Sequence, residues 1–196
     1  MASLGVKADP ERDEIAVDGV PLPREPRKVY LMLNKPRGYV TTLSDEKGRK
    51  TAAELVADCG ERVWPVGRLD RNSEGLLIFT NDGELTQMLL HPASETEKEY
   101  LVRVDGWHPG ALDVLRGEIT LDGQALSPAR VEVRRREGET VLLDVVIHEG
   151  KNRQIRRMCE LAGLRVLRLR RIRDGKLRLG DLKSGQWRVL TRDEII

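Results

Sequence analysis

The sequence contains few cysteines and few aromatic residues, and it has no long hydrophobic run. Its two cysteines, Cys59 and Cys159, lie far apart and outside any CxxC pair, so we expect two buried thiols and no disulfide framework. No apolar run approaches the roughly 18 residues that span a bilayer. The N-terminus lacks the basic-then-apolar pattern of a signal peptide. These absences favour a cytoplasmic protein that does not enter a membrane.

Motifs for metals and cofactors are missing as well. The three histidines, His91, His108 and His148, do not have the spacing of metal ligands. The sequence contains neither a phosphate-binding P-loop nor the glycine fingerprint of a dinucleotide-binding fold. We therefore expect no metal and no cofactor.

A dense basic block contrasts with the small charge of the whole chain. Between Lys151 and Arg178, two lysines and nine arginines face only Glu160 and Asp174, a net charge of +9, whereas the entire chain carries +2. A block of this density indicates a polyanionic partner, and its excess of arginine over lysine suits planar phosphate groups. A solvated charged face is the alternative, but apolar residues interrupt the charges periodically, as they do in a folded element.

Hydrophobic patterning predicts an α+β fold. Residues 9–20 have the pattern of a turn and a short strand, and a proline-containing linker at 21–27 separates them from a body at 28–196. Strands outnumber helices without βαβ alternation, so we expect a large, mostly antiparallel sheet. The expected strands are 29–34, 63–66, 76–80, 99–105, 129–135, 141–147, 165–171 and 187–190. The expected helices are 51–56, one that follows Asp82, 111–115 and 151–162.

Periodicity also assigns faces to three of these elements. The helix at 151–162 should bury Ile155, Met158, Cys159 and Ala162. The helix after Asp82 should bury Leu85, Met88 and Leu89. In the strand at 165–171, alternation places Leu167 and Leu169 on one face and Arg168 and Arg170 on the other.

A glycine-bounded loop holds one aspartate between two apolar strands. In GRLDRNSEG (67–75), Asp70 lies between Arg68 and Arg71, where the strands would fix the carboxylate and the guanidinium groups would keep it ionised. Taken alone, such an aspartate is more often a turn-stabilising residue, and the chain has 32 acidic residues. The local sequence therefore does not separate a catalytic residue from a turn residue.

Two further segments place polar groups in a regular context. Tyr100 lies near the start of the strand 99–105, where an ordinary half-buried tyrosine is the alternative. The segment HEGKNRQIRRM (148–158) joins a strand to a basic helix, whose N-terminal N–H groups would attract phosphate. A capped amphipathic helix with a charged outer side would show the same pattern.

Together these segments resemble a known family. GRLDxxSxGLLIxTNDG (67–83), KxY (98–100) and EGxNRQIRRM (149–158) are similar, in order and spacing, to the RsuA/RluB-type ribosomal RNA pseudouridine synthases. Three more segments extend the resemblance over residues 28–190, namely 33–42, 162–172 and 179–190. It implies the pseudouridine synthase fold, with a curved sheet, flanking helices and two subdomains around a central RNA-binding cleft.

The resemblance also implies a reaction and the residues that carry it. The N1–C1′ bond of a uridine breaks, the uracil turns, and C5 bonds to C1′, with no metal or cofactor. Asp70 matches the catalytic aspartate, which acts at C1′ or as a base at C2′. Tyr100 matches the tyrosine that stacks on the base and helps to remove the C5 proton, and Lys151 matches the basic partner of the aspartate. Ile147 falls at the apolar position that packs against the uracil.

Further side chains are expected to bind RNA. A target base must leave its stack, and Arg68 is expected to fill the gap by resemblance. The other expected contacts are Lys35, Arg37, Arg71, Asn152, Arg153, Arg156, Arg157, Arg168 and Arg170. A structural role behind the active site is the alternative for Arg156.

The basic helix and strand look most like the RluB-type enzymes, so we expect a monomer that acts on 23S rRNA or a pre-ribosomal particle. Arg173-Asp174-Gly175-Lys176 departs from the Gly-Pro expected in that loop. Residues 1–20 resemble the last strands of an S4 RNA-binding domain without its helical part. The alternatives are a 16S rRNA or tRNA pseudouridine synthase, and a non-catalytic RNA-binding or ribosome-assembly module.

Overall fold

The computed structural model describes residues 16–17, 20–21, 27–91 and 96–196. A short hairpin, β1 (Ala16–Val17) with β2 (Val20–Pro21), precedes the body. The rest of the segment compared with an S4 domain, and residues 22–26 of the linker expected at 21–27, lie outside the described residues. No helix in the described residues is long and apolar enough to cross a membrane.

The body contains short helices and longer strands, as the sequence pattern predicts. The helical elements are the 3₁₀ helix η1 (Ala52–Cys59), α1 (Gly83–Leu90), α2 (Ala111–Arg116), α3 (Gln154–Leu161) and α4 (Arg192–Ile195). The strands are β3 (Tyr30–Lys35), β4 (Trp64–Val66), β5 (Glu74–Thr80), β6 (Lys98–Asp105), β7 (Thr120–Leu121), β8 (Gln124–Ala125), β9 (Arg130–Glu137), β10 (Thr140–Ile147), β11 (Arg165–Asp174), β12 (Leu177–Arg178) and β13 (Trp187–Val189).

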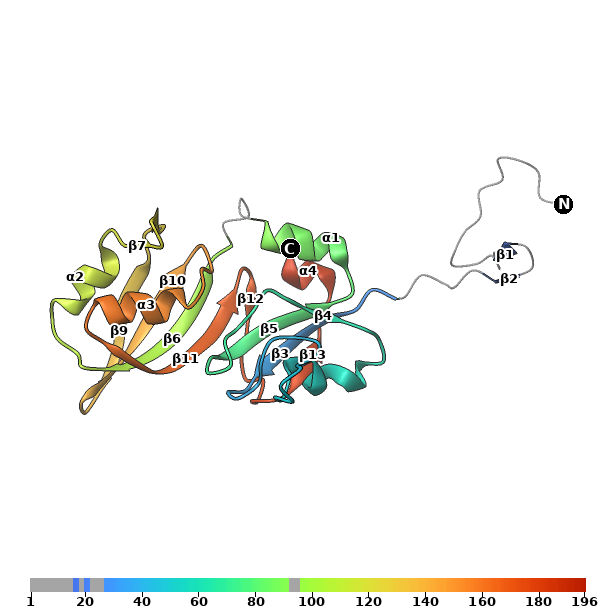
Figure 1. Cartoon of the computed structure of the whole chain (residues 1–196), viewed down its shortest axis with the longest axis horizontal. Coiled ribbons are helices and arrows are strands. Elements are labelled where there is room, and N and C mark those ends of the chain that lie inside the picture. Colours follow the sequence, from blue (N-terminus) through green and yellow to red (C-terminus); the bar gives the residue numbers. More distant parts are fainter. Residues whose placement is uncertain (1–15, 18–19, 22–26, 92–95) are drawn as a thin grey trace.

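One sheet runs through the body in the order β13-β3-β5-β11-β6-β10-β9, with β4 beside β5 and β12 beside β11. Its strands pair antiparallel except β5 and β11, which are parallel. The expected α+β fold with a mostly antiparallel sheet is confirmed. Figure 1 shows α2 and α3 over the part of the sheet formed by β6, β9 and β10, whereas α1 and α4 lie together beside β4 and β5.

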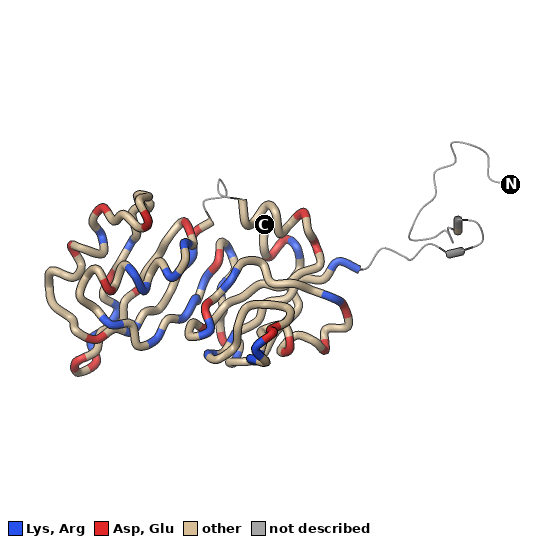
Figure 2. The backbone as a smooth tube through the Cα atoms, viewed as in Figure 1, with Lys and Arg blue, Asp and Glu red and all other residues tan. Residues whose placement is uncertain are grey.

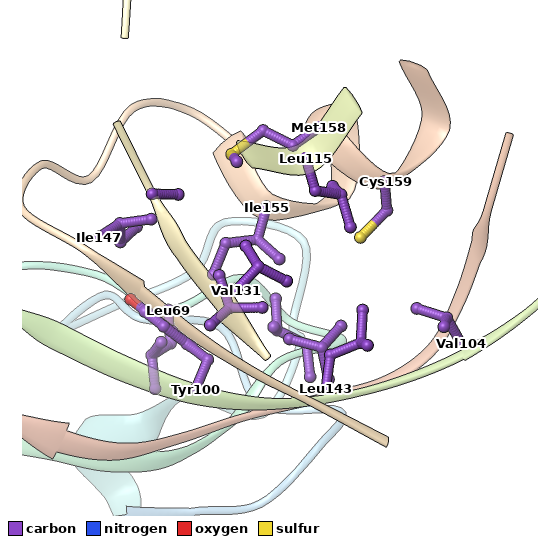
Figure 3. Close-up of a cluster of buried hydrophobic side chains, with 14 of the residues drawn as sticks. Leu69, Tyr100, Val104, Leu115, Val131, Leu143, Ile147, Ile155, Met158 and Cys159 are labelled. Carbon is purple, nitrogen blue, oxygen red and sulfur yellow. The ribbon is translucent and has the colours of Figure 1, made fainter. Parts of the chain in front are cut away.

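The core lies on both faces of β5, which is why residues 76–79 are continuously apolar. Leu77 and Phe79 join a large cluster that extends to β6, β10 and α3, part of which is drawn in Figure 3. Leu76 and Ile78 join a second cluster with residues of α1 and α4. The two clusters hold the strands around the parallel junction in place.

Glycine is required at the parallel junction between β5 and β11. Gly75 lies opposite Arg171, with a φ of +105°. A Cβ atom at this position would lie 2.1 Å from the carbonyl oxygen of Arg171, so no other residue fits without moving the strand. This close approach fixes β11 beside the loop that precedes β5.

Three expectations from periodicity were wrong. The helix expected from residue 151 begins at Gln154, because Arg153 has a left-handed φ of 50°. A β-bulge between Val166 and Arg168 breaks the alternation of β11, so Val166 and Leu169 pack in the core and Leu167 does not share their face. Met88 is 47% exposed, although Leu85 of the same helix is buried.

Candidate active site

A cleft is lined by the three segments that the sequence analysis singled out, namely the Asp70 loop, the strand of Tyr100 and the segment before the basic helix. It is lined by the loop before β5, by β6 and β11, and by the chain between β10 and α3. Of the predicted site residues, it contains Arg68, Asp70, Tyr100, Ile147, Lys151, Asn152 and Arg153. The predicted residues outside its lining are Lys35, Arg37, Arg71, Arg156, Arg157, Arg168 and Arg170.

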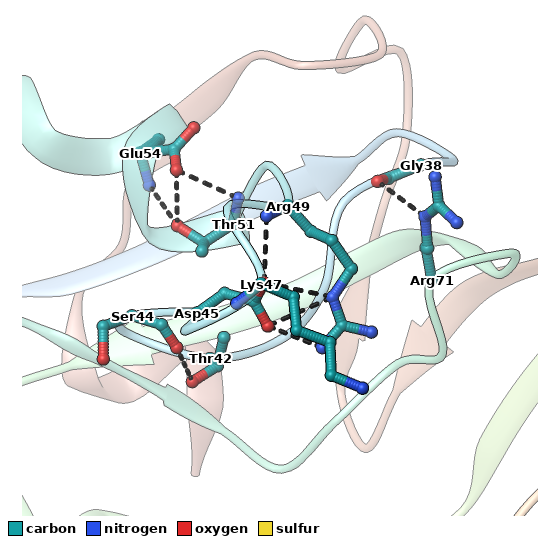
Figure 4. Close-up of polar contacts among 9 residues, drawn as sticks. All are labelled: Gly38, Thr42, Ser44, Asp45, Lys47, Arg49, Thr51, Glu54 and Arg71. Carbon is teal, nitrogen blue, oxygen red and sulfur yellow. Dashed lines mark hydrogen bonds and ion pairs between the residues drawn. The ribbon is translucent and has the colours of Figure 1, made fainter.

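Hydrogen bonds anchor the loop that carries Asp70 to the segment that follows β3. Thr41 Oγ1 donates to the carbonyl of Leu69 (2.7 Å) and accepts from its N–H. The N–H of Gly38 donates to the carbonyl of Arg71 (2.7 Å), and Arg71 Nε donates back to the Gly38 carbonyl, as Figure 4 shows. The Asp70 carboxylate stays about one-third exposed, at 34%. The loop is therefore fixed while its carboxylate faces the cleft.

Lys35 lies beneath this loop, and its predicted phosphate contact was wrong. The side chain is fully buried, and its Nζ donates to the carbonyls of Pro36 (3.0 Å), Asp70 (3.2 Å) and Ser73 (2.8 Å). Burial lowers the pKa of Lys35 to about 8, against the opposing effect of Asp70 and Glu74. Lys35 shapes the loop from below and does not reach solvent.

The burial of Lys35 predicts a pH-dependent stability. Because its pKa falls from 10.5 to about 8 on folding, the unfolded chain binds more protons between these pH values. The free energy of unfolding of the wild type should therefore rise with pH there, by up to about 1.4 kcal/mol per pH unit, relative to Lys35→Met. Urea unfolding of both proteins across this range measures the difference. If the difference in unfolding free energy between the two proteins does not change with pH, the lowered pKa of Lys35 is contradicted.

Two guanidinium groups approach the Asp70 carboxylate. Arg153 Nη1 lies 3.7 Å and Arg156 Nε 3.9 Å from Asp70 Oδ2. The Arg153 side chain is 51% exposed, so solvent screens its charge, whereas that of Arg156 is 13% exposed. Arg156 Nη2 also donates to the carbonyl of Asn72 (3.0 Å), which ties α3 to the loop. Arg156 is therefore the main cation beside Asp70.

Lys151, which the sequence predicts as the partner of Asp70, contacts other groups. Its Nζ donates to Gln124 Oε1 (3.0 Å) and lies 3.9 Å from Glu149 Oε2. The reason is that the residues before Gln154 form a turn and not the first turn of α3. Arg156 thus stands where Lys151 was expected, and the structural role considered for Arg156 describes its contacts better than a phosphate contact does.

Tyr100 and Ile147 form the apolar wall of the cleft. Tyr100 is 7% exposed and lies between β10 and β11, opposite Val145 and Arg171. Burial raises the pKa of its hydroxyl. Ile147 ends β10 and is also buried. Figure 3 shows both residues in the cluster that packs beneath α3.

The basic residues around the cleft are only partly free to meet a polyanion. Figure 2 shows lysines and arginines along α3 and β11. Arg157 makes two hydrogen bonds to Asp122 (2.7 and 2.8 Å), and Arg168 lies 2.6 Å from Glu74. Arg37 and Asn152 are exposed, and Arg170 is half-buried. The +9 block is therefore partly neutralised by ion pairs with distant segments.

Three cleft residues were not among the site residues expected from the sequence. Arg171, Asp174 and Lys98 line the cleft on neighbouring strands, with Asp174 opposite Lys98. Arg171 is 3% exposed. An arginine at a buried position of an alternating strand was the available signal. Among the described residues, no group of three or more histidine, cysteine, aspartate or glutamate side chains could hold a metal ion.

Comparisons with known proteins agree with this arrangement. The profile of a family described as RNA pseudouridylate synthase matches residues 29–161. An uncharacterized RNA pseudouridine synthase of Aquifex aeolicus is 44% identical, over 100% of this chain and 79% of the relative. The ribosomal large subunit pseudouridine synthase B of Bacillus subtilis is 38% identical, over 100% of this chain and 80% of the relative. A crystal structure of a pseudouridylate synthase superposes with a TM-score of 0.77 at 29% identity, covering 98% of this chain and 83% of that one.

Proposed function

The chain belongs to the RNA pseudouridylate synthase family, and on that premise we propose that it isomerises uridine in 23S ribosomal RNA with Asp70 as the catalytic residue. The family match confirms the resemblance found in the sequence, and the protein is an RNA pseudouridine synthase. One observation carries the choice of Asp70. Its carboxylate stands on an anchored loop in the cleft, with the half-buried Arg156 guanidinium behind it.

The geometry around Asp70 fits the demands of the reaction. An aspartate that acts as a nucleophile or base must be ionised, and Arg156 and Arg153 offset its negative charge. Tyr100 and Ile147 offer an apolar surface for the flipped uracil, whose unstacking costs a few kcal/mol. Exclusion of water by the bound base strengthens the interaction between Asp70 and Arg156.

The same carboxylate serves two chemical routes. As a nucleophile, Asp70 attacks C1′ and the uracil leaves; as a base, it removes the C2′ proton first. RNA that carries deuterium at C2′ of the target distinguishes them. A primary isotope effect on the single-turnover rate constant supports the base, and its absence supports the nucleophile.

Large-subunit rRNA is the proposed substrate because two relatives are named for it. The Bacillus subtilis protein and one from Pseudomonas aeruginosa, 39% identical over 100% of this chain and 52% of its own length, are both named ribosomal large subunit pseudouridine synthase B. We propose that the chain acts as a monomer in the cytoplasm, where its ribosomal RNA substrate would be found. Residues 28–196 would form the catalytic unit, and Arg68 would fill the place of the flipped base.

Purified protein can be incubated separately with transcripts of 23S rRNA, 16S rRNA and tRNA. Carbodiimide-adduct primer extension then reports pseudouridine at single-nucleotide resolution. We expect a new stop in the 23S transcript alone. A stop only in 16S rRNA or tRNA contradicts the substrate, and no stop in any RNA contradicts the proposed activity. Light scattering of the same preparation tests the monomer.

The exposed basic residues of the cleft should contribute to RNA affinity through phosphate contacts. Arg153 lines the cleft and is half-exposed, so Arg153→Glu should weaken RNA binding and reduce the slope of log K against log salt by about 1. Filter binding at several salt concentrations measures both quantities. Arg62→Glu is the matched control, because Arg62 is exposed and does not line the cleft. Equal losses for both variants indicate only a general effect of net charge.

A further inference from the structure

Arg171 is a buried arginine in the wall of the cleft, and the contacts described so far give it no role. It lies on β11 between β5 and β6, and 3% of its surface is exposed. It lines the cleft together with Asp70 and Tyr100. An arginine is rarely buried this deeply unless its charge and its donors are paired.

The donors of Arg171 are only partly used. Its Nε donates to the carbonyl of Leu76 (2.8 Å), and its Nη1 lies 3.4 Å from Asp174 Oδ2. Its Nη2 is buried and has no hydrogen-bond partner. Leaving such a donor unpaired costs about 1–3 kcal/mol, so an acceptor is expected at some stage of the reaction.

Tyr100 is the neighbouring group on which Arg171 can act. The two residues are directly opposite each other across the antiparallel pair of β6 and β11, and both are buried. The charge of Arg171 lowers the pKa of the Tyr100 hydroxyl, whereas burial, which is the larger effect, and Asp174 raise it. The guanidinium is therefore close enough to favour negative charge on the phenolic oxygen.

The last step of the proposed reaction needs a base near C5 of the uracil. After the C5–C1′ bond forms, C5 still carries its hydrogen. Its removal as a proton leaves the electron pair to restore the C5–C6 double bond. The base first releases its own proton to water and then takes the C5 proton, and N1 takes one proton from water, so the composition of the RNA is unchanged.

We propose that Arg171 is a positioning residue for Tyr100, and that its unpaired Nη2 donor stabilises the phenolate that Tyr100 forms by releasing its own proton to water, so that this phenolate can take the C5 proton and return to the neutral phenol. Asp174 holds the guanidinium in place and balances its charge while Tyr100 is neutral. The inference rests on the proposed function. It adds two residues of β11, Arg171 and Asp174, to the machinery of the final proton transfer.

Other charged groups near Tyr100 set the background for this role. Asp70 approaches from the loop before β5 and raises the pKa of Tyr100. Lys98 lies on β6 itself, opposite Asp174, and its own pKa is lowered by burial. The residue paired with Tyr100 on β10 is Val145, which carries no charge. Arg171 is thus the cation whose charge acts on the phenolic oxygen.

The test compares Arg171→Met and Arg171→Lys with the wild type on 23S rRNA that carries uridine or 5-deuterouridine at the modified position. If Arg171 assists C5 proton removal, Arg171→Met should slow the single-turnover rate constant by about 100-fold and raise the deuterium isotope effect. Arg171→Lys should restore part of the rate, because it keeps the charge. In a Tyr100→Phe background, Arg171→Met should cause no further loss beyond about twofold.

The pH dependence of the rate constant gives a second readout, because two variants should shift it in opposite directions. Arg171→Met should move the rise of the rate to higher pH, and Asp174→Asn should move it to lower pH, because these two groups act on Tyr100 in opposite directions. Arg173→Lys is the matched control, because Arg173 lies on β11 like Arg171 but pairs with Glu97 and Glu99 and does not line the cleft. It should change neither the isotope effect nor the profile.

An unchanged isotope effect in the Arg171 variants, or a full additional loss in the Tyr100→Phe background, overturns the role of Arg171. If Arg171→Met does not fold, Arg171→Lys and Asp174→Asn decide the question by the same two readouts. A wild type that forms no pseudouridine contradicts the proposed function itself. An active wild type with insensitive variants contradicts only this inference.

Discussion

Asp70→Asn is expected to abolish pseudouridine formation in a protein that still folds and binds RNA. Asparagine keeps the shape of the side chain but can neither attack C1′ nor accept the C2′ proton. The anchors of the loop use the backbone of Leu69, Asp70 and Arg71, so they survive the change. The single-turnover rate constant should fall by about 10³-fold or more. Pseudouridine mapping on the modified transcript gives the rate, and filter binding gives the affinity.

A second carboxylate provides the matched control for this experiment. Asp45 is held by Arg49, as Figure 4 shows, and this pairing lowers its pKa to about 2. Asp45 does not line the cleft. Asp45→Asn removes the same charge without touching the proposed chemistry, so its rate constant should stay within about threefold of the wild type. Turnover by Asp70→Asn at a comparable rate would falsify the assignment of Asp70.

Arg156→Met should lower the single-turnover rate constant by about 100-fold, with little change in RNA affinity. Its guanidinium lies 3.9 Å from the Asp70 carboxylate and contacts the carbonyl of Asn72. Methionine removes both the charge and the anchor. Arg156→Lys keeps the charge but not the fork of donors, so its loss should be smaller.

Lys151→Met separates the two candidate partners of Asp70. The Lys151 ammonium interacts with Gln124 and Glu149, so its removal should lower the rate constant by less than about tenfold. The two variants can be measured with the same RNA and the same assay. A larger loss for Lys151→Met than for Arg156→Met means that the pairing predicted from the sequence forms when RNA binds.

The sequence was sufficient for the parts of the fold that depend on local pattern. The continuous apolar run of β5 and the alternation of β6 predicted strands that exist. The helix expected at 51–56 exists as η1, which Thr51 and Glu54 cap with a capping box, although the helix is 3₁₀ and extends to Cys59. The bulges of β11 could not be predicted, because an extra residue changes the register without changing the composition of the strand.

The same limit applies to the site. The Asp70 loop and Tyr100 were found because their motifs are local, and the structure places both in one cleft. The burial of Lys35 depends on carbonyls more than 30 residues away, which no local pattern reveals. The choice between Lys151 and Arg156 depended on where α3 begins, since a shift of three residues changes which side chains face the loop. Arg171 was missed because its acceptor, the Leu76 carbonyl, lies on another strand.

Pseudouridine mapping in cells tests the central claim most directly. Ribosomal RNA is compared between cells that lack this gene and the same cells carrying either the wild type or Asp70→Asn. One carbodiimide-dependent stop in 23S rRNA should disappear in the deletion, return with the wild type and stay absent with Asp70→Asn. A 23S pattern that is identical in all of these cells, or a stop restored by Asp70→Asn, contradicts the account.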